Sequence, residues 1–162
     1  MKARFPFAAT LAALVVAIPL VAAAVPHAGD VAPPFTLPRT DGGTVSLAKL
    51  KGKPVYLNFF ASWCAPCNDE APAVARLTLK YRPRGLVTIG VDEQEDKSKA
   101  IGFARQYRLP YAIVLDGGPM GQSYGAIALP VHVFIDRQGT VSTYRLGQMD
   151  PSEIEDAIKK IL

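Results

Sequence analysis

The chain contains two cysteines, Cys64 and Cys67, and their spacing bears directly on chemistry. Two thiols three positions apart can close a disulfide and open it again, which is redox chemistry. A strand-like apolar run at 55–60 precedes the pair and a helical pattern follows it. Cys64 is therefore expected at a helix N-terminus, where unpaired N–H groups and the helix dipole favour the thiolate. We interpret Cys64 as the nucleophile and Cys67 as the residue that resolves the mixed disulfide.

Two other uses of these cysteines remain open from the residues alone. Small exported domains often use paired cysteines as structural cross-links, although a bridge across so short a loop constrains the unfolded chain little. His132 offers a third ligand, because two thiolates and an imidazole suit Cu(I). Copper handling by Cys64, Cys67 and His132 is therefore the competing function. A satisfied core histidine is the structural interpretation of His132, which has apolar residues on both sides.

The first 24 residues resemble an export signal. Lys2 and Arg4 precede an apolar run, and residues 22–24 are the small residues that a cleavage site needs. The run approaches the roughly 20 residues that span a bilayer, so an uncleaved membrane tether through residues 5–24 is the alternative. Both interpretations place the domain in the periplasm or on the outer face of the cytoplasmic membrane. Residues 25–34, rich in proline, are predicted to be a linker to a domain at 35–162.

The composition suits one globular core and gives no sign of a nucleic-acid partner. The chain is 49% hydrophobic and 20% charged. The formal net charge is +4, but two of the basic residues, Lys2 and Arg4, belong to the predicted leader. No basic block or basic patch with interleaved aromatic residues is present in the sequence, so we expect no nucleic-acid binding.

The order of the predicted elements indicates an α/β fold. A hairpin is expected at 35–46, because the Asp-Gly-Gly turn lies between two short apolar runs. Later strands are predicted at 55–60, 86–91, 111–115, 131–136 and 141–146, and helices at 65–81, about 97–107 and 151–162. Residues 92–96 are predicted to be an acidic loop. This order implies a mixed sheet with helices on both faces.

Several of these residues together resemble a known family. The run FFASWCAPC at 59–67, Glu70 and Pro72 after it, and Leu129-Pro130 ahead of a strand resemble the thioredoxin superfamily. The resemblance is closest to the exported TlpA, ResA and DsbE/CcmG group. It implies a thioredoxin fold carrying an extra N-terminal β-hairpin, and an exported thiol-disulfide oxidoreductase. It also implies that the only redox group is the disulfide, with no bound cofactor and no metal.

The resemblance assigns four residues to substrate binding. Pro130 matches the cis-proline that faces the disulfide, which leaves backbone groups of Leu129 free to pair with a bound peptide strand. Its structural alternative is an ordinary proline at the start of a strand. Trp63 is expected to shield the disulfide and line the binding surface. Pro66 is expected to shape the turn that contains the disulfide.

One departure from the family pattern directs attention to a carboxyl group. Asn58 lies six residues before Cys64, where many thioredoxins have a buried aspartate that deprotonates the inner cysteine. Asparagine cannot take a proton, so another group must. Glu70, one helical turn beyond Cys67, is the candidate, because a half-buried carboxyl can exchange protons near neutral pH. The alternative is an exposed helix glutamate with no role.

The resemblance also implies partners and a direction. The expected partners are cysteine-containing exported proteins, such as apocytochrome c or proteins of copper sites, with a membrane electron donor that re-reduces the pair. The family favours a reductant, and the sequence leaves the direction of electron flow open. A thiol peroxidase is disfavoured, because Leu57 and Ala61 stand where that chemistry needs proline and threonine.

Overall fold

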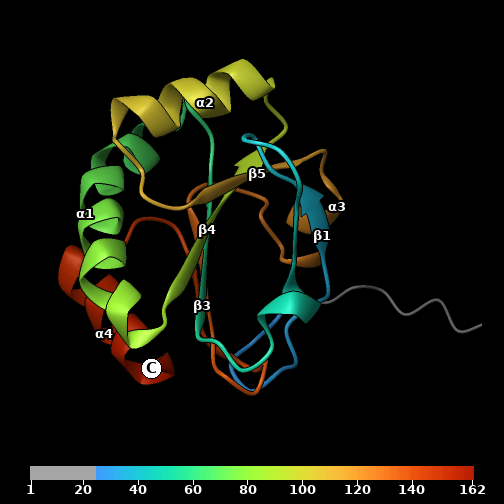
Figure 1. The fold of residues 1–162 in the computed structure, drawn as a ribbon, viewed down its shortest axis with the longest axis vertical. Helices are drawn as coiled ribbons and strands as arrows, with labels where there is room; N and C mark the ends of the chain where they lie inside the picture. Colours follow the sequence, from blue (N-terminus) through green and yellow to red (C-terminus); the bar gives the residue numbers. More distant parts are fainter. Residues whose placement is uncertain (1–24) are drawn as a thin grey trace, which may run out of the picture.

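A computed structural model describes residues 25–162, so the predicted leader at 1–24 lies outside the described residues. These residues form a two-stranded hairpin, a five-stranded sheet and the helices that cover it (Figure 1). In chain order the elements are β1 (Thr36–Pro38), β2 (Thr44–Ser46), the 3₁₀ turn η1 (Leu47–Leu50), β3 (Val55–Phe60), α1 (Ala65–Tyr81), η2 (Arg82–Arg84), β4 (Val87–Glu93), α2 (Lys97–Gln106), β5 (Ala112–Asp116), α3 (Pro119–Ser123), β6 (Val131–Ile135), β7 (Val141–Leu146) and α4 (Pro151–Ile161). From residue 25 onward no helix has the length and apolarity needed to cross a membrane.

The five-stranded sheet has the order β5-β4-β3-β6-β7. The central strand β3 is parallel to β4 and antiparallel to β6, which makes the sheet mixed. All six residues of β3 are buried, as expected for an apolar run without alternation that is covered on both faces. Because the central strand β3 ends just before the cysteines, the two cysteines lie beyond the C-terminal end of this strand, midway across the sheet.

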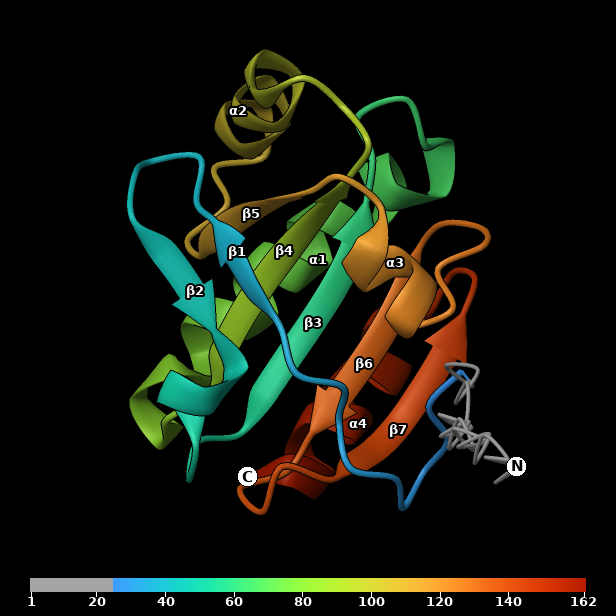
Figure 2. The ribbon, with the colours of Figure 1, turned by 90° about the vertical axis from the view of Figure 1, so that its right-hand side faces the viewer.

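Helices cover both faces of the sheet, which confirms the predicted architecture. On one face Ile154 and Ile158 of α4 pack with Tyr56 and with residues of α1, and Phe103 of α2 stacks on Phe60 with 4.5 Å between ring centroids. Figure 2 shows the other face, which α3 and the β1–β2 hairpin cover. The predicted N-terminal hairpin is confirmed, with Gly42 and Gly43 at positive φ in its turn.

Part of the segment predicted as a linker is attached to the domain. Gly29 N–H donates to Val141 O at 2.8 Å, and Ala32 N–H donates to Gly139 O at 3.0 Å. Ala32 is also buried against the core. These backbone bonds hold residues 29–32 beside the turn between β6 and β7. The division of the chain at residue 35 stays a prediction.

The predicted end of β4 was wrong by two residues. The strand was expected to stop at Val91, with Asp92 opening an acidic loop, but it continues through Glu93. Pairing with β5 accounts for the difference, because Asp92 and Glu93 continue the ladder opposite Leu115 and Asp116. Asp92 is fully buried and Glu93 nearly so. We call residues 61–67, which lead from β3 into α1 and contain both cysteines, the redox turn. The strand β4 therefore ends in two buried carboxyl groups close to the redox turn.

Candidate active site

The disulfide between Cys64 and Cys67 lies at the N-terminus of α1, as predicted. Cys64 is the N-cap residue of this helix, and its Sγ accepts the backbone N–H of Cys67 at 3.3 Å. Each cysteine is 4% exposed, so burial does not distinguish the two. Their positions do, because the Cys64 sulfur receives the helix N–H group and the dipole that stabilise a thiolate.

Two polar residues that the sequence did not single out hold the turn around the disulfide. Asn68 Nδ2 donates to the carbonyl oxygens of Ser62 and Cys64 at 3.1 and 2.7 Å, and its Oδ1 accepts the Tyr107 hydroxyl. Glu95 accepts both the backbone N–H and the hydroxyl of Ser62. Neither residue belongs to a recognisable motif. The contact between Glu95 and Ser62 joins residues 33 positions apart, which local sequence does not encode, whereas Asn68 binds carbonyl groups only four and six positions before it.

The peptide bond between Leu129 and Pro130 is cis, as predicted. Leu129 and Trp63 both line a shallow depression beside the redox turn, together with Gln94 and Ile127. Trp63 is 70% exposed and Ile127 is 87% exposed, which gives the depression an apolar rim. Pro130 is buried and does not line it. The structure thus brings two of the four predicted substrate-binding residues to one surface.

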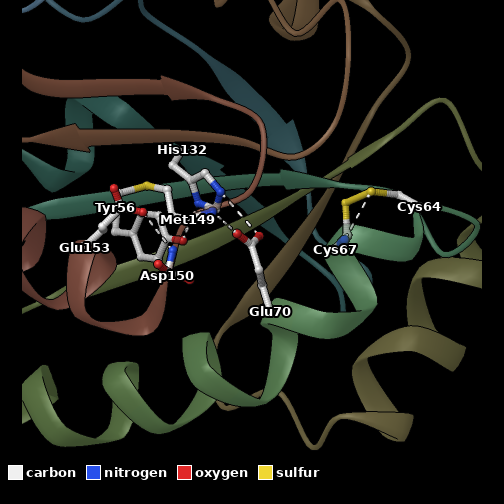
Figure 3. A network of polar contacts seen from close by, with 8 residues as sticks. All are labelled: Tyr56, Cys64, Cys67, Glu70, His132, Met149, Asp150 and Glu153. Carbon is white, nitrogen blue, oxygen red and sulfur yellow. Dashed lines mark hydrogen bonds and ion pairs between the residues drawn. A yellow bond between two sulfur atoms is a disulfide. The ribbon is translucent and has the colours of Figure 1, made fainter.

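Glu70 is buried rather than half-buried, and it lies in a polar network behind the disulfide (Figure 3). Its Oε1 accepts the Met149 backbone N–H at 2.5 Å, and its Oε2 lies 3.3 Å from His132 Nε2. His132 Nδ1 lies 2.8 Å from the Tyr56 hydroxyl. In Figure 3 Glu70 and the disulfide both rise from α1 toward the sheet. The alternative of an exposed helix glutamate is therefore wrong.

The structure does not bring His132 to the sulfur atoms as a copper ligand. Both ring nitrogens face other groups, the Tyr56 hydroxyl and the Glu70 carboxylate. Among residues 25–162 there is no cluster of three or more His, Cys, Asp or Glu residues that could hold a metal ion. The interpretation of His132 as a buried core histidine fits its full burial.

Two carboxyl groups at the end of β4 have raised pKa values. Burial, and secondarily the charge of Glu95, raises the pKa of Asp92 to about 7. Burial, and secondarily the charge of Asp116, raises the pKa of Glu93 to about 8. Asp116 is itself held by the N–H groups of Met120 and Gly121 at the start of α3. Asp92 and Glu93 lie beside the redox turn, and their raised pKa values allow them to exchange protons near neutral pH.

Comparison with known proteins decides the family. The family model of the AhpC/TSA family matches residues 28–144. The chain belongs to the AhpC/TSA family. Among curated relatives, the thiol-disulfide oxidoreductase ResA of Bacillus cereus is 35% identical over 134 residues, which are 82% of this chain and 78% of that protein.

Solved structures of similar proteins have the same fold. A protein of Chlorobium tepidum described as the thiol:disulfide interchange protein DsbE is 31% identical, with a TM-score of 0.78 over 84% of this chain and 98% of that one. A secreted disulfide oxidoreductase of Mycobacterium tuberculosis, homologous to DsbE of E. coli, is 25% identical, with a TM-score of 0.71 over 78% of this chain and 95% of that one. The predicted thioredoxin fold and the resemblance to the ResA and DsbE group are confirmed. This AhpC/TSA protein is a thiol-disulfide oxidoreductase of the ResA and DsbE type with a Cys64–Cys67 disulfide.

Proposed function

We propose that the protein is exported and reduces disulfides of cysteine-containing partner proteins outside the cytoplasm, in cytochrome c maturation or a similar process. The observation that carries the proposal is Cys64 at the N-cap of α1, with its sulfur accepting the Cys67 N–H, beside a depression with an apolar rim. Relatives named ResA and the secreted DsbE homologue support the assignment. Residues 5–24 would tether the protein to the membrane or direct its export.

The reaction follows from the positions of the two sulfurs. The Cys64 thiolate attacks a partner disulfide, forms a mixed disulfide and releases one partner thiolate. Cys67 then loses its proton to Glu70 and attacks Cys64, which releases the second partner thiolate and leaves the Cys64–Cys67 disulfide. Two electrons pass to the partner, and a membrane electron donor returns them to the pair.

The partner would bind as an extended segment across the rim of the depression. Trp63 offers an exposed aromatic surface, and backbone groups of Leu129, whose peptide bond to Pro130 is cis, would pair with the segment. Pro66, between the cysteines, would fix the shape of the turn while the mixed disulfide forms. Exposed apolar side chains beside the disulfide suit a protein partner, because exposed apolar patches mark protein–protein contact sites.

Trapping variants test the order of attack. Cys67→Ser leaves the nucleophile without a resolving thiol, so it should accumulate mixed disulfides with exported partners, identified by mass spectrometry after non-reducing electrophoresis. Cys64→Ser is the matched control and should trap none. Trapping by Cys64→Ser instead would reverse the assigned roles.

The reduction potential tests the direction of electron flow. A reductant should have a potential near that of thioredoxin, about −270 mV, whereas a potential near about −120 mV, as in DsbA, would make the protein an oxidant. Equilibration of the Cys64–Cys67 pair with glutathione or dithiothreitol buffers measures this value. An oxidising value would contradict the proposed reductase role while leaving the thiol-disulfide chemistry intact.

A further inference from the structure

His132 is the one basic side chain that is buried among residues 25–162, and the function proposed above gives it no role. It lies on β6 directly opposite Asn58 of β3, the strand that leads into the redox turn. Asn58 occupies the position where many thioredoxins have a buried, proton-accepting aspartate. Near the disulfide, Glu70 of α1 and His132 of β6 are the titratable residues that lie close to each other (Figure 3).

The Tyr56 hydroxyl decides which nitrogen of His132 carries the proton. Tyr56 is fully buried, and within the described chain its hydroxyl has no hydrogen-bond partner besides His132 Nδ1, 2.8 Å away. A buried hydroxyl proton without an acceptor is costly, so the hydroxyl donates and Nδ1 accepts. Burial also raises the pKa of Tyr56 well above its ordinary value, which keeps the proton on the phenol. The neutral imidazole then carries its own proton on Nε2.

The Nε2–H group faces the Glu70 carboxylate. Nε2 lies 3.3 Å from Oε2, and in the described chain neither atom has a hydrogen bond to any other group. The Met149 N–H donates to the other oxygen, Oε1. Each oxygen of the Glu70 carboxylate therefore faces one N–H group. The Nε2 contact is not aligned as a full hydrogen bond, so Oε2 keeps a lone pair that can receive a proton.

We propose that His132 is a positioning residue that holds the Glu70 carboxylate turned toward the sheet, where this carboxylate receives the Cys67 proton. The inference rests on the proposed function and deepens it. In the resolving step the Cys67 proton passes to Glu70 Oε2, and the Cys67 sulfur bonds to the Cys64 sulfur. The bond between Cys64 and the partner breaks, and the partner sulfur leaves as a thiolate. The proton on Glu70 then returns to solvent.

The other titratable and charged groups near this network, Tyr111 and Arg145, do not take over the contact of His132 with Glu70. Tyr111 lies near Tyr56 and acts in the same direction on its pKa as burial does. Arg145 of β7 pairs with His132 in the strand register, but its side chain is 52% exposed and lies 3.6 Å from Glu153. Solvent screens such an exposed charge. Glu70 and Tyr56 are therefore the two groups that face the ring nitrogens of His132.

Four variants separate the donor from the bulk of the imidazole. His132→Leu removes both nitrogens, whereas His132→Gln keeps an N–H donor that reaches Glu70 without titrating. His132→Asn reaches Tyr56 alone, and Tyr56→Phe removes the group that fixes the tautomer. Val133→Ala, a truncation of a fully buried β6 residue that packs on the opposite face, controls for lost stability. The measured quantity is the rate at which a preformed mixed disulfide on Cys64 resolves, as a function of pH.

The expected result is a change in the pH profile, which lost packing alone would not produce. His132→Leu should slow resolution about tenfold at pH 7 and move the profile toward higher pH, because the carboxylate loses a donor to its charged form. His132→Gln should restore most of the rate, and His132→Asn should not. Tyr56→Phe should fall between the leucine variant and the wild type. Val133→Ala should unfold at a lower urea concentration than the wild type, and its resolution rate should keep the wild-type dependence on pH.

Combination with Glu70→Gln tests whether His132 acts through the carboxylate. In that background His132→Leu should cause no further slowing, because the group it positions is gone. Further slowing, or a wild-type profile in His132→Leu, would overturn the inference. An unchanged rate in Glu70→Gln would overturn it as well, together with the proton-carrying role of Glu70. Failure of the wild-type protein to reduce any protein disulfide would instead contradict the proposed function itself.

Discussion

The Glu95 carboxylate accepts two hydrogen bonds from Ser62, one from its backbone N–H at 2.5 Å and one from its hydroxyl at 2.7 Å. Ser62 lies two residues before Cys64, and Glu95 lies in the loop between β4 and α2. The loop after β4 therefore fixes the segment that enters the redox turn from β3. On the other side of this turn, Asn68 binds the carbonyl of the same serine.

Removal of the Glu95 carboxylate should loosen the redox turn. Glu95→Ala leaves the Ser62 N–H and hydroxyl without their acceptor, so we expect a loss of about 1–3 kcal/mol in unfolding free energy. Exchange with a protein disulfide should slow, and hydrogen exchange of the Ser62 amide should accelerate. Asp69→Ala removes an exposed carboxylate on α1 and controls for the change in charge. An unchanged hydrogen-exchange rate of the Ser62 amide in Glu95→Ala would contradict the conclusion that Glu95 fixes the segment entering the redox turn.

The buried Asp92 carboxyl should make stability fall as pH rises. Its pKa is raised from 3.8 to about 7, so between these values the folded state binds a proton that the unfolded state has lost. The unfolding free energy therefore declines through this window. Asp92→Asn stays neutral and should be more stable than the wild type at pH 8 by about 2 kcal/mol, with no such difference near pH 4.

Urea unfolding at several pH values measures this difference. The matched control is Asp69→Asn, which makes the same chemical change at an exposed position. Glu93→Gln should behave like Asp92→Asn with the window extended to about pH 8, since burial and Asp116 raise the pKa of Glu93 that far. An equal stability difference between Asp92→Asn and the wild type at pH 5 and pH 8 would contradict the assignment.

The features that the sequence predicted well depend on neighbouring residues. The cysteine spacing after a buried strand placed Cys64 at a helix N-terminus. Turn glycines placed the hairpin. Each of these signals operates within a few residues of the feature it predicts, so no knowledge of the tertiary contacts was needed.

The features that the sequence missed depend on contacts between distant residues. His132 meets Glu70 because β6 pairs with β3 in a register that sets Asn58 opposite His132. A slip of one residue would turn the His132 side chain to the other face of the sheet. Asp92 was predicted to lie in a loop because charged residues rarely lie inside strands. Pairing with β5 overrode that preference, and the resulting burial raises the pKa of the Asp92 carboxyl to about 7.

Gly90 is required by the packing behind the redox turn. A Cβ at this position would lie 2.6 Å from Ile113 Cδ1, 3.0 Å from Phe60 Cε1 and 3.2 Å from Tyr111 Cε2. Gly90→Ala should therefore lower the unfolding free energy by about 1–3 kcal/mol, as overpacking does. Gly102→Ala is the matched control, because a Cβ there meets nothing within 4 Å and alanine favours the helix. Equal unfolding midpoints for Gly90→Ala and the wild type would contradict the tight packing.

Trp63 should contribute to partner binding far more than to folding. Its side chain is 70% exposed beside the disulfide, so Trp63→Ala should change the unfolding free energy by no more than about 0.5 kcal/mol. An aromatic side chain at the centre of an interface often contributes about 2 kcal/mol or more, so kcat/KM for a protein disulfide should fall at least tenfold. Leu79→Ala removes an exposed apolar residue on α1 and controls for lost surface. Equal decreases of kcat/KM for a protein disulfide in Trp63→Ala and Leu79→Ala would contradict a place for Trp63 in the partner-binding surface.

The fluorescence of Trp63 also reports the redox state directly, because Trp63 is the only tryptophan. Its emission should change on reduction of the wild-type protein.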